Sequence, residues 1–234
     1  MTATIVFDFD GTIVVGPGPV LAYAREMARF AGDDFLARAE RTLRAFEDGE
    51  TGDFRDGYDV VGRLAADAGV AEADRQSAYL ESRALLGTPA AAPAELADGL
   101  AGILARLPRT TRVVLATNAP AVGVEPALEA WGVRERFDEI VYDTGKPDGL
   151  APLIHRALAR GPVLSVGDIV ENDLAPAAAL GADTALVGAT ARTATFPATM
   201  RAASLAELAD PIAAWARAAA QTPAPTGAAT PSER

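Results

Sequence analysis

The chain has 234 residues, of which 50% are hydrophobic and 23% are charged, and its formal net charge is −11. This composition is typical of a soluble globular protein with a substantial core, as one large domain or as a domain with a smaller insert. The negative charge disfavours nucleic acid and anionic membrane surfaces as partners. Cysteine is absent and His155 is the only histidine. Disulfides and thiolate metal sites are therefore excluded. A multi-histidine zinc site or a histidine-based catalytic triad is disfavoured, because a single histidine supplies almost none of the residues that it needs.

A short apolar run followed by two carboxylates opens the chain. Residues 4–7 are too few and too β-branched for a helix and predict a buried strand. Asp8 and Asp10 would leave this strand at the edge of a parallel sheet, where ligands bind, and Gly11 would release the backbone into a turn. Two carboxylates so close together repel unless a divalent cation lies between them or one keeps its proton. The alternative is an ordinary acidic turn, since Asp and Gly are common turn residues.

No basic and apolar leader precedes this strand, and the longest apolar runs are broken well before a membrane-spanning length. We therefore expect a cytoplasmic protein without a membrane partner.

A long segment with helical periodicity follows the first strand. Apolar residues recur at helical spacing from residue 20 to about residue 86 and predict four helices. No strand is expected between residues 13 and 86. Clusters of Gly and Pro at residues 16–19 and 87–93 bracket the segment and predict two hinges. We interpret residues 15–92 as an inserted helical domain.

Strands and helices alternate through the rest of the chain. The predicted helices cover residues 94–107, 126–131, 150–159, 172–180 and 204–220, the last interrupted near Pro211, and the predicted strands cover 112–117, 139–142, 162–167 and 184–187. This alternation predicts an α/β fold, with a parallel sheet that helices cover on both faces. Residues 1–14 and 93–220 would form it. The tail over residues 221–234 lacks apolar content and is expected to be disordered.

Small polar or charged residues follow four of the predicted strands. They form four short motifs, at residues 8–12 (DFDGT), 117–118 (TN), 146–147 (KP) and 167–173 (GDIVEND). In this order the motifs resemble the signatures of the haloacid dehalogenase superfamily of phosphotransferases. The resemblance extends from residue 4 to about residue 210. It implies a Rossmann-like parallel core with the helical segment in the place of that family's cap.

The resemblance implies a Mg²⁺-dependent phosphatase that hydrolyses a small phosphorylated metabolite through an aspartyl-phosphate. Asp8 would be the nucleophile, and Asp10 the general acid and base, a residue that the family's dehalogenases and cation-pumping ATPases do not have. Lys146, the only lysine in a chain that otherwise uses arginine, would bridge the phosphoryl group and the nucleophile. Phosphate binding is expected at Asp8, Gly11, Thr12, Thr117, Asn118 and Lys146.

Hard oxygen ligands suit Mg²⁺, and the resemblance places Asp8, Asp168, Asp173 and the backbone carbonyl of Asp10 around it. For Asp173, direct ligation of the metal has two alternatives. Its carboxylate would orient another metal ligand without touching the metal, or it would cap a helix that begins near Leu174. Thr117 and the N–H of Asn118 would hydrogen-bond phosphoryl oxygens in the transition state. The alternative is that they are only polar residues at the start of a helix.

The loop at residues 50–58 carries Arg55 and Tyr58, which would contact the substrate under a mobile cap; an ordinary interhelical loop is an equal alternative. His155 is expected to be a packed helix residue rather than a catalyst. A phosphomutase is the second functional hypothesis, disfavoured because the helical segment lacks a histidine near the first hinge. A non-catalytic phosphate-ligand-binding protein is the third. The absence of lysine from residues 13–93 excludes the family branch that cleaves carbon–phosphorus bonds through a cap lysine.

Overall fold

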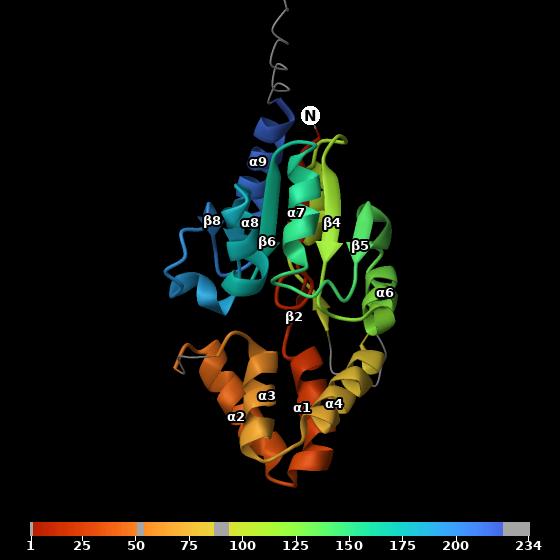
Figure 1. Cartoon of the computed structure of the whole chain (residues 1–234), viewed down its shortest axis with the longest axis vertical. Helices are drawn as coiled ribbons and strands as arrows, with labels where there is room; N and C mark the ends of the chain where they lie inside the picture. The colour runs from red at the N-terminus through yellow and green to blue at the C-terminus, as the bar shows by residue number, and fades with distance from the viewer. Residues whose placement is uncertain (1, 51–53, 87–93, 222–234) are drawn as a thin grey trace, which may run out of the picture.

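The computed structural model describes residues 2–50, 54–86 and 94–221. One part of the chain, the sheet part, is a six-stranded parallel sheet covered by helices. Four further helices form a separate helical unit beyond the carboxyl ends of the strands (Figure 1). The predicted α/β fold is confirmed.

Strand β1 (Thr4–Phe7) lies at the centre of the sheet, and all four of its residues are buried. It pairs in parallel with β4 (Arg112–Ala116) on one side and β6 (Val163–Gly167) on the other. The full strand order is β5-β4-β1-β6-β7-β8, completed by β5 (Glu139–Val141), β7 (Asp183–Leu186) and β8 (Met200–Arg201). Because the strands are parallel, all their carboxyl ends meet at one edge of the sheet, which faces the helical unit (Figure 1).

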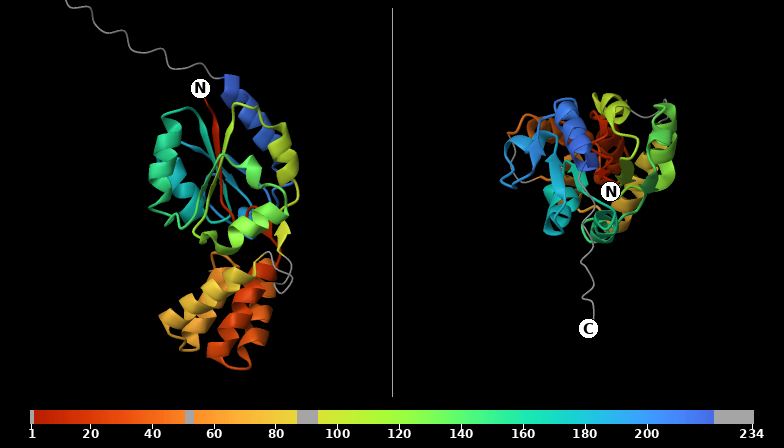
Figure 2. Two further views of the ribbon diagram at one scale, coloured as in Figure 1. Left: turned by 90° about the vertical axis from the view of Figure 1, so that its right-hand side faces the viewer. Right: turned by 90° about the horizontal axis from the view of Figure 1, so that it is seen from above.

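Helices cover both faces of this sheet (Figure 2). One face carries α5 (Leu100–Arg106), α6 (Ala121–Ala130) and α9 (Ala209–Gln221), and the other carries α7 (Leu150–Leu158) and α8 (Ala175–Ala179). Ile5 and Phe7 pack into the first core and Val6 into the second. This is the alternation that a strand imposes on successive side chains. Three short turns complete the part: η1 (Arg134–Arg136), η2 (Val170–Leu174) and η3 (Ala189–Arg192).

The helical unit consists of α1 (Gly18–Ala31), α2 (Phe35–Glu47), α3 (Gly57–Asp67) and α4 (Glu72–Leu85), as the periodicity predicts. It has a hydrophobic core of its own, which includes Met27, Phe35 and Val61. The short strands β2 (Val14–Val15) and β3 (Glu95–Leu96) pair antiparallel beside the unit. The prediction of no strand between residues 13 and 86 is therefore wrong at β2.

Two further element boundaries differ from the prediction on the N-terminal side of β4. Residues 95–96 belong to β3 rather than to a helix, because they pair with β2, and α5 begins only at Leu100. In the first predicted hinge, Gly18 and Pro19 already form the start of α1. Proline is tolerated there because the first turn of a helix has no acceptor for its missing N–H.

The C-terminal part differs in a similar way. The last helix, α9, begins at Ala209 and not at residue 204, and Pro211 lies in its first turn instead of interrupting it. Strand β8 was not predicted, since two residues show no periodicity. The second predicted hinge at residues 87–93 and the tail beyond residue 221 lie outside the described residues. Among the helices that the structure describes, none has the length and apolar character needed to cross a membrane.

Candidate active site

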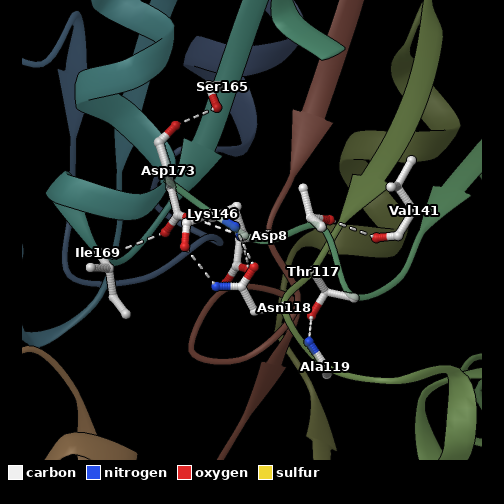
Figure 3. Close-up of polar contacts among 10 residues, drawn as sticks. Asp8, Thr117, Asn118, Ala119, Val141, Lys146, Ser165, Ile169 and Asp173 are labelled. Atoms are coloured by element: carbon white, nitrogen blue, oxygen red, sulfur yellow. Dashed lines mark hydrogen bonds and ion pairs between the residues drawn. The ribbon is translucent and has the colours of Figure 1, made fainter. Parts of the chain in front are cut away.

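The carboxyl edge of the sheet brings together residues that are far apart in the sequence (Figure 3). Asp8 directly follows β1, Lys146 lies between β5 and α7, and Asp173 lies in the turn η2. The Nζ atom of Lys146 donates to Oδ1 of Asp8 at 2.5 Å and to Oδ1 of Asp173 at 2.6 Å. One ammonium group therefore bridges two buried carboxylates.

Asp168 completes an acidic cluster directly after β6. Carboxylate oxygens of Asp8, Asp168 and Asp173 all lie within 4.8 Å of one another. Oδ1 of Asp168 is buried, and no group in the described residues hydrogen-bonds to it. An unsatisfied carboxylate oxygen is costly in the interior, and three carboxylates outnumber one ammonium. The cluster therefore fits a metal ion, and its oxygen-only donors suit a hard divalent cation.

The pKa values of these groups reflect the same crowding. The pKa of Asp8 is raised to about 7, chiefly by burial; Lys146 opposes this rise, and the charges of Asp173 and Asp10 contribute to it. Burial and the neighbouring Asp8 and Asp173 charges hold the pKa of Asp168 well above its ordinary value. Burial alone would lower the pKa of Lys146, but the carboxylates of Asp8 and Asp173 outweigh burial and raise it. A bound cation would favour the ionised carboxylates.

Asn118 fixes the backbone of the lysine. Its Oδ1 accepts from the N–H of Lys146 at 2.7 Å, and its Nδ2 donates to the carbonyl oxygen of Lys146 at 3.2 Å. This clamp by the Asn118 side chain was not predicted, because it joins residues that lie 28 positions apart in the chain. Thr117 is buried, and its hydroxyl oxygen accepts from the N–H of Ala119 at 3.0 Å, which orders the loop after β4.

Two glycines allow the acidic cluster to form. Gly11 has φ +76°, and a Cβ atom on it would overlap the carboxylate of Asp168. A Cβ atom on Gly167 would likewise overlap the side chain of Asp173. These positions need glycine because a carboxylate approaches the backbone there.

Asp173 does not cap a helix that begins near Leu174. It lies inside η2, and its Oδ2 accepts from the N–H of Ile169, the residue just before that turn, at 3.0 Å. Its carbonyl oxygen accepts from the hydroxyl of Ser165 at 2.7 Å. The predicted helix at residues 172–180 is thus a π-helical turn followed by the short helix α8, and the turn aims Asp173 at Lys146.

Two residues of the helical unit hydrogen-bond to the side chain of Asp10. Nη1 of Arg83, in α4, donates to Oδ1 of Asp10 at 2.7 Å, and the hydroxyl of Tyr58, in α3, lies 3.2 Å from the same oxygen. Arg83 was missed in the sequence, because it occurs at ordinary helical spacing among many other arginines. Only its burial at 1% side-chain exposure distinguishes it.

Several cavities open between the sheet and the helical unit in the part of the chain that the structure describes, and two of them border Lys146 or Asp10. One of about 560 Å³ is lined by Lys146 and Asn118 from the sheet part and by Tyr58 and Tyr79 from the helical unit. The other, of about 250 Å³, is lined by Asp10 and by residues of both parts. The polar site thus lies between the carboxyl edge of the sheet and the helical unit.

The family model of haloacid dehalogenase-like hydrolases matches residues 2–181. The chain belongs to this family. No curated protein matches it at a significant level.

Solved structures of the superfamily share the fold of this hydrolase. YfnB from Bacillus subtilis, described as a HAD-hydrolase bound to magnesium, is 21% identical with a TM-score of 0.59, over 90% of this chain and 98% of YfnB. CbbY from Rhodobacter sphaeroides, in complex with phosphate, is 21% identical with a TM-score of 0.55, over 89% and 96%. A 2-haloacid dehalogenase from Pseudomonas syringae pv. Tomato DC3000 is 17% identical with a TM-score of 0.52, over 92% and 100%.

Two residues singled out in the sequence lie apart from the acidic cluster of this hydrolase. Arg55 lines both cavities, but its guanidinium pairs with Asp59 at 3.0 Å and is half-exposed. His155 is on α7 and exposed, so the expectation of a packed side chain is wrong. Thr12, in contrast, is buried next to Gly11, and no partner for its hydroxyl occurs in the described part of the chain.

Proposed function

We propose that the protein is a Mg²⁺-dependent phosphatase that hydrolyses a small phosphomonoester through an aspartyl-phosphate on Asp8. The observation that carries the proposal is the contact between Asp8 and the only lysine of the chain, beside carboxylates that fit a cation. A second acid, Asp10, lines a cavity together with Asp168. An acid at this position supports phosphoryl transfer over dehalogenation.

The first step forms the covalent intermediate. A carboxylate oxygen of Asp8 attacks phosphorus, the bond from phosphorus to the ester oxygen breaks, and Asp10 gives its proton to the leaving oxygen. In the second step water attacks the same phosphorus, Asp10 takes a proton from that water, and Asp8 leaves as a carboxylate. The products are the alcohol and inorganic phosphate, and both aspartates return to their starting state.

The remaining site residues would bind the phosphoryl group. Lys146 is placed to neutralise its charge, since its Nζ already contacts the nucleophile. The hydroxyl of Thr117 and the backbone N–H of Asn118 would donate to phosphoryl oxygens, and Gly11 and Thr12 would do so from the turn after β1.

Asp8, Asp168, Asp173 and the backbone carbonyl of Asp10 would hold Mg²⁺. When bound, the ion supplies positive charge that offsets both the carboxylate cluster and the substrate. The helical unit would act as a cap that excludes water and selects the substrate. Arg55 and Tyr58 would contribute to this selection by contacting the substrate. The two cavities, of about 560 and 250 Å³, favour a metabolite-sized substrate.

Release of inorganic phosphate from p-nitrophenyl phosphate, and then from a panel of phosphorylated metabolites, tests the proposal. Activity should require Mg²⁺ and should be lost in Asp8→Asn, while Asp210→Asn should keep it because the Asp210 side chain is 89% exposed. Full activity of Asp8→Asn would contradict the covalent mechanism. Chloride release from a 2-chloro acid would instead indicate a dehalogenase, and dependence on a sugar bisphosphate would indicate a mutase.

A further inference from the structure

Arg83 is the largest fully buried side chain in the described residues. It lies in the last turns of α4, and its side chain is 1% exposed. Its guanidinium lies over the ring of Phe9, from the turn after β1, with 5.7 Å to the centroid, and over Tyr79, from α4, with 5.9 Å. The group is therefore held between the sheet and the helical unit.

The polar contacts of Arg83 converge on one oxygen. Nη1 donates to Oδ1 of Asp10 at 2.7 Å and to the hydroxyl oxygen of Tyr58 at 2.9 Å. The Tyr58 hydroxyl donates in turn to Oδ1 of Asp10 at 3.2 Å. Oδ1 thus accepts two hydrogen bonds, both from the helical unit.

The position of Arg83 depends on the contact between α4 and α6. Gly123, in α6, has φ +81°, and a Cβ atom on it would overlap the carbonyl oxygen of Arg83. Only glycine allows α4 to approach the sheet part this closely. The guanidinium reaches Asp10 because the two parts are seated against each other at this point.

Stability alone does not favour an arginine in this place. Nε and Nη2 of Arg83 are buried, and neither has a hydrogen-bond partner in the part of the chain that the structure describes. A buried charge with unmet donors costs free energy, and an apolar side chain of similar volume often serves as well or better. The arginine therefore points to a role for its contact with the one charged partner that it has in the described residues, the carboxylate of Asp10.

We infer that Arg83 is a positioning residue for Asp10: together with Tyr58 it holds Oδ1, so that Asp10 is aligned only when the helical unit is seated on the sheet. The inference rests on the proposed function, in which Asp10 transfers protons to and from the substrate. Fixing one carboxylate oxygen fixes the direction of the other, and proton transfer depends strongly on such alignment. The acid would then be ready only when the site is closed to water.

The test compares two substrates of similar shape whose leaving groups differ in their need for a proton. Phenyl phosphate depends on protonation of its leaving oxygen, and p-nitrophenyl phosphate depends on it much less. With Mg²⁺ present, Arg83→Met should lower kcat/KM for phenyl phosphate by about 10- to 100-fold, as expected for impaired general acid catalysis. The loss for p-nitrophenyl phosphate should be several times smaller. An equal loss for both substrates would overturn the inference.

A double-mutant cycle shows whether Arg83 acts through Asp10. In the Asp10→Asn background, Arg83→Met should cause little further loss, since the group that it positions is already gone. Fully additive losses would contradict the inference. Arg29→Met is the matched control, because Arg29 likewise forms an ion pair with another helix, to Glu81 of α4, but its side chain is 60% exposed and its carboxylate partners are Glu26 and Glu81 rather than Asp10.

Two further measurements keep the test decisive. Tyr58→Phe removes one of the two hydrogen bonds to Oδ1 and should show the same leaving-group pattern with a smaller amplitude, even if Arg83→Met folds poorly. A crystal structure of Arg83→Met should show Asp10 in a different side-chain rotamer. An unchanged rotamer would overturn the inference whether or not the protein is a phosphatase, whereas absence of phosphate release from the native protein would defeat the proposed function alone.

Discussion

The Nζ atom of Lys146 lies 2.5 Å from Oδ1 of Asp8, although 138 residues separate the two in the chain. The contact forms because β1 ends beside the loop that follows β5, and because Asn118 clamps the backbone of that loop. The other basic side chains of this chain are arginines and its single histidine. Substitution of Lys146 is therefore the most direct test of the proposed active site.

Replacing Lys146 by Met should lower kcat/KM for phosphate release by about 100-fold or more, because a fixed charge that stabilises the transition state is lost. Lys146→Arg should restore little, since a planar guanidinium does not fit the space of a compact ammonium between two carboxylates. Steady-state kinetics check both variants, with Arg106→Met as the control, which loses an exposed pair with Asp210 and a hydrogen bond to the carbonyl oxygen of Gly102. A variant Lys146→Met with native activity would contradict the role given to the lysine.

Magnesium should stabilise the folded protein through the acidic cluster. Free Mg²⁺ at 100 times its dissociation constant should add about 2.7 kcal/mol to the free energy of unfolding. Asp168→Asn should abolish most of this gain, and without Mg²⁺ it should be more stable than the native protein, because one buried like charge is removed. Urea unfolding with Mg²⁺ and with EDTA measures both effects. The order of the two proteins should therefore reverse on adding the ion, and Asp210→Asn should show no such reversal.

Gly11→Ala should be more damaging than its backbone conformation alone explains. Gly11 and Gly49 have nearly the same φ, +76° and +75°, but a Cβ atom meets the Asp168 carboxylate at Gly11 and nothing within 4 Å at Gly49. Each alanine should cost about 1 kcal/mol in backbone strain. Gly11→Ala should lose about 1–3 kcal/mol more through overpacking and should also lose the Mg²⁺-dependent stabilisation. Equal unfolding free energies of the two variants would show that Gly11 does not hold the cluster.

The contact between α4 and α6 can likewise be tested by comparing two Gly→Ala variants, one inside the contact and one outside it. Gly123→Ala should push α4 away from α6, because its Cβ atom would overlap Arg83, whereas Gly132→Ala, also at positive φ, meets nothing within 4 Å. We expect Gly123→Ala to increase amide hydrogen exchange in the last turns of α4 and to lower kcat/KM, and Gly132→Ala to do neither beyond its strain cost. Unchanged exchange in α4 would show that the close approach is not needed for seating.

The sequence predicted the strand at residues 4–7 and the polar residues Asp8, Lys146 and Asp168 at one edge of a sheet. This was possible because strand periodicity is local, and because parallel strands place all their carboxyl ends together. The helices of the helical unit were predicted for the same reason, since an amphipathic period is written in consecutive residues. The motifs also named the family correctly.

The tertiary structure alone decided which residues that are distant in the chain meet. The pairing of β2 with β3, the clamp of Asn118 on Lys146 and the reach of Arg83 to Asp10 each join residues that are distant in the chain. Local periodicity contains no information on such partners: Arg83 has the spacing of any helical arginine, and Gly123 looks like an ordinary break in a helix. Their burial and their contacts arise only when the helical unit packs on the sheet, because close packing between separate elements depends on the shapes of both.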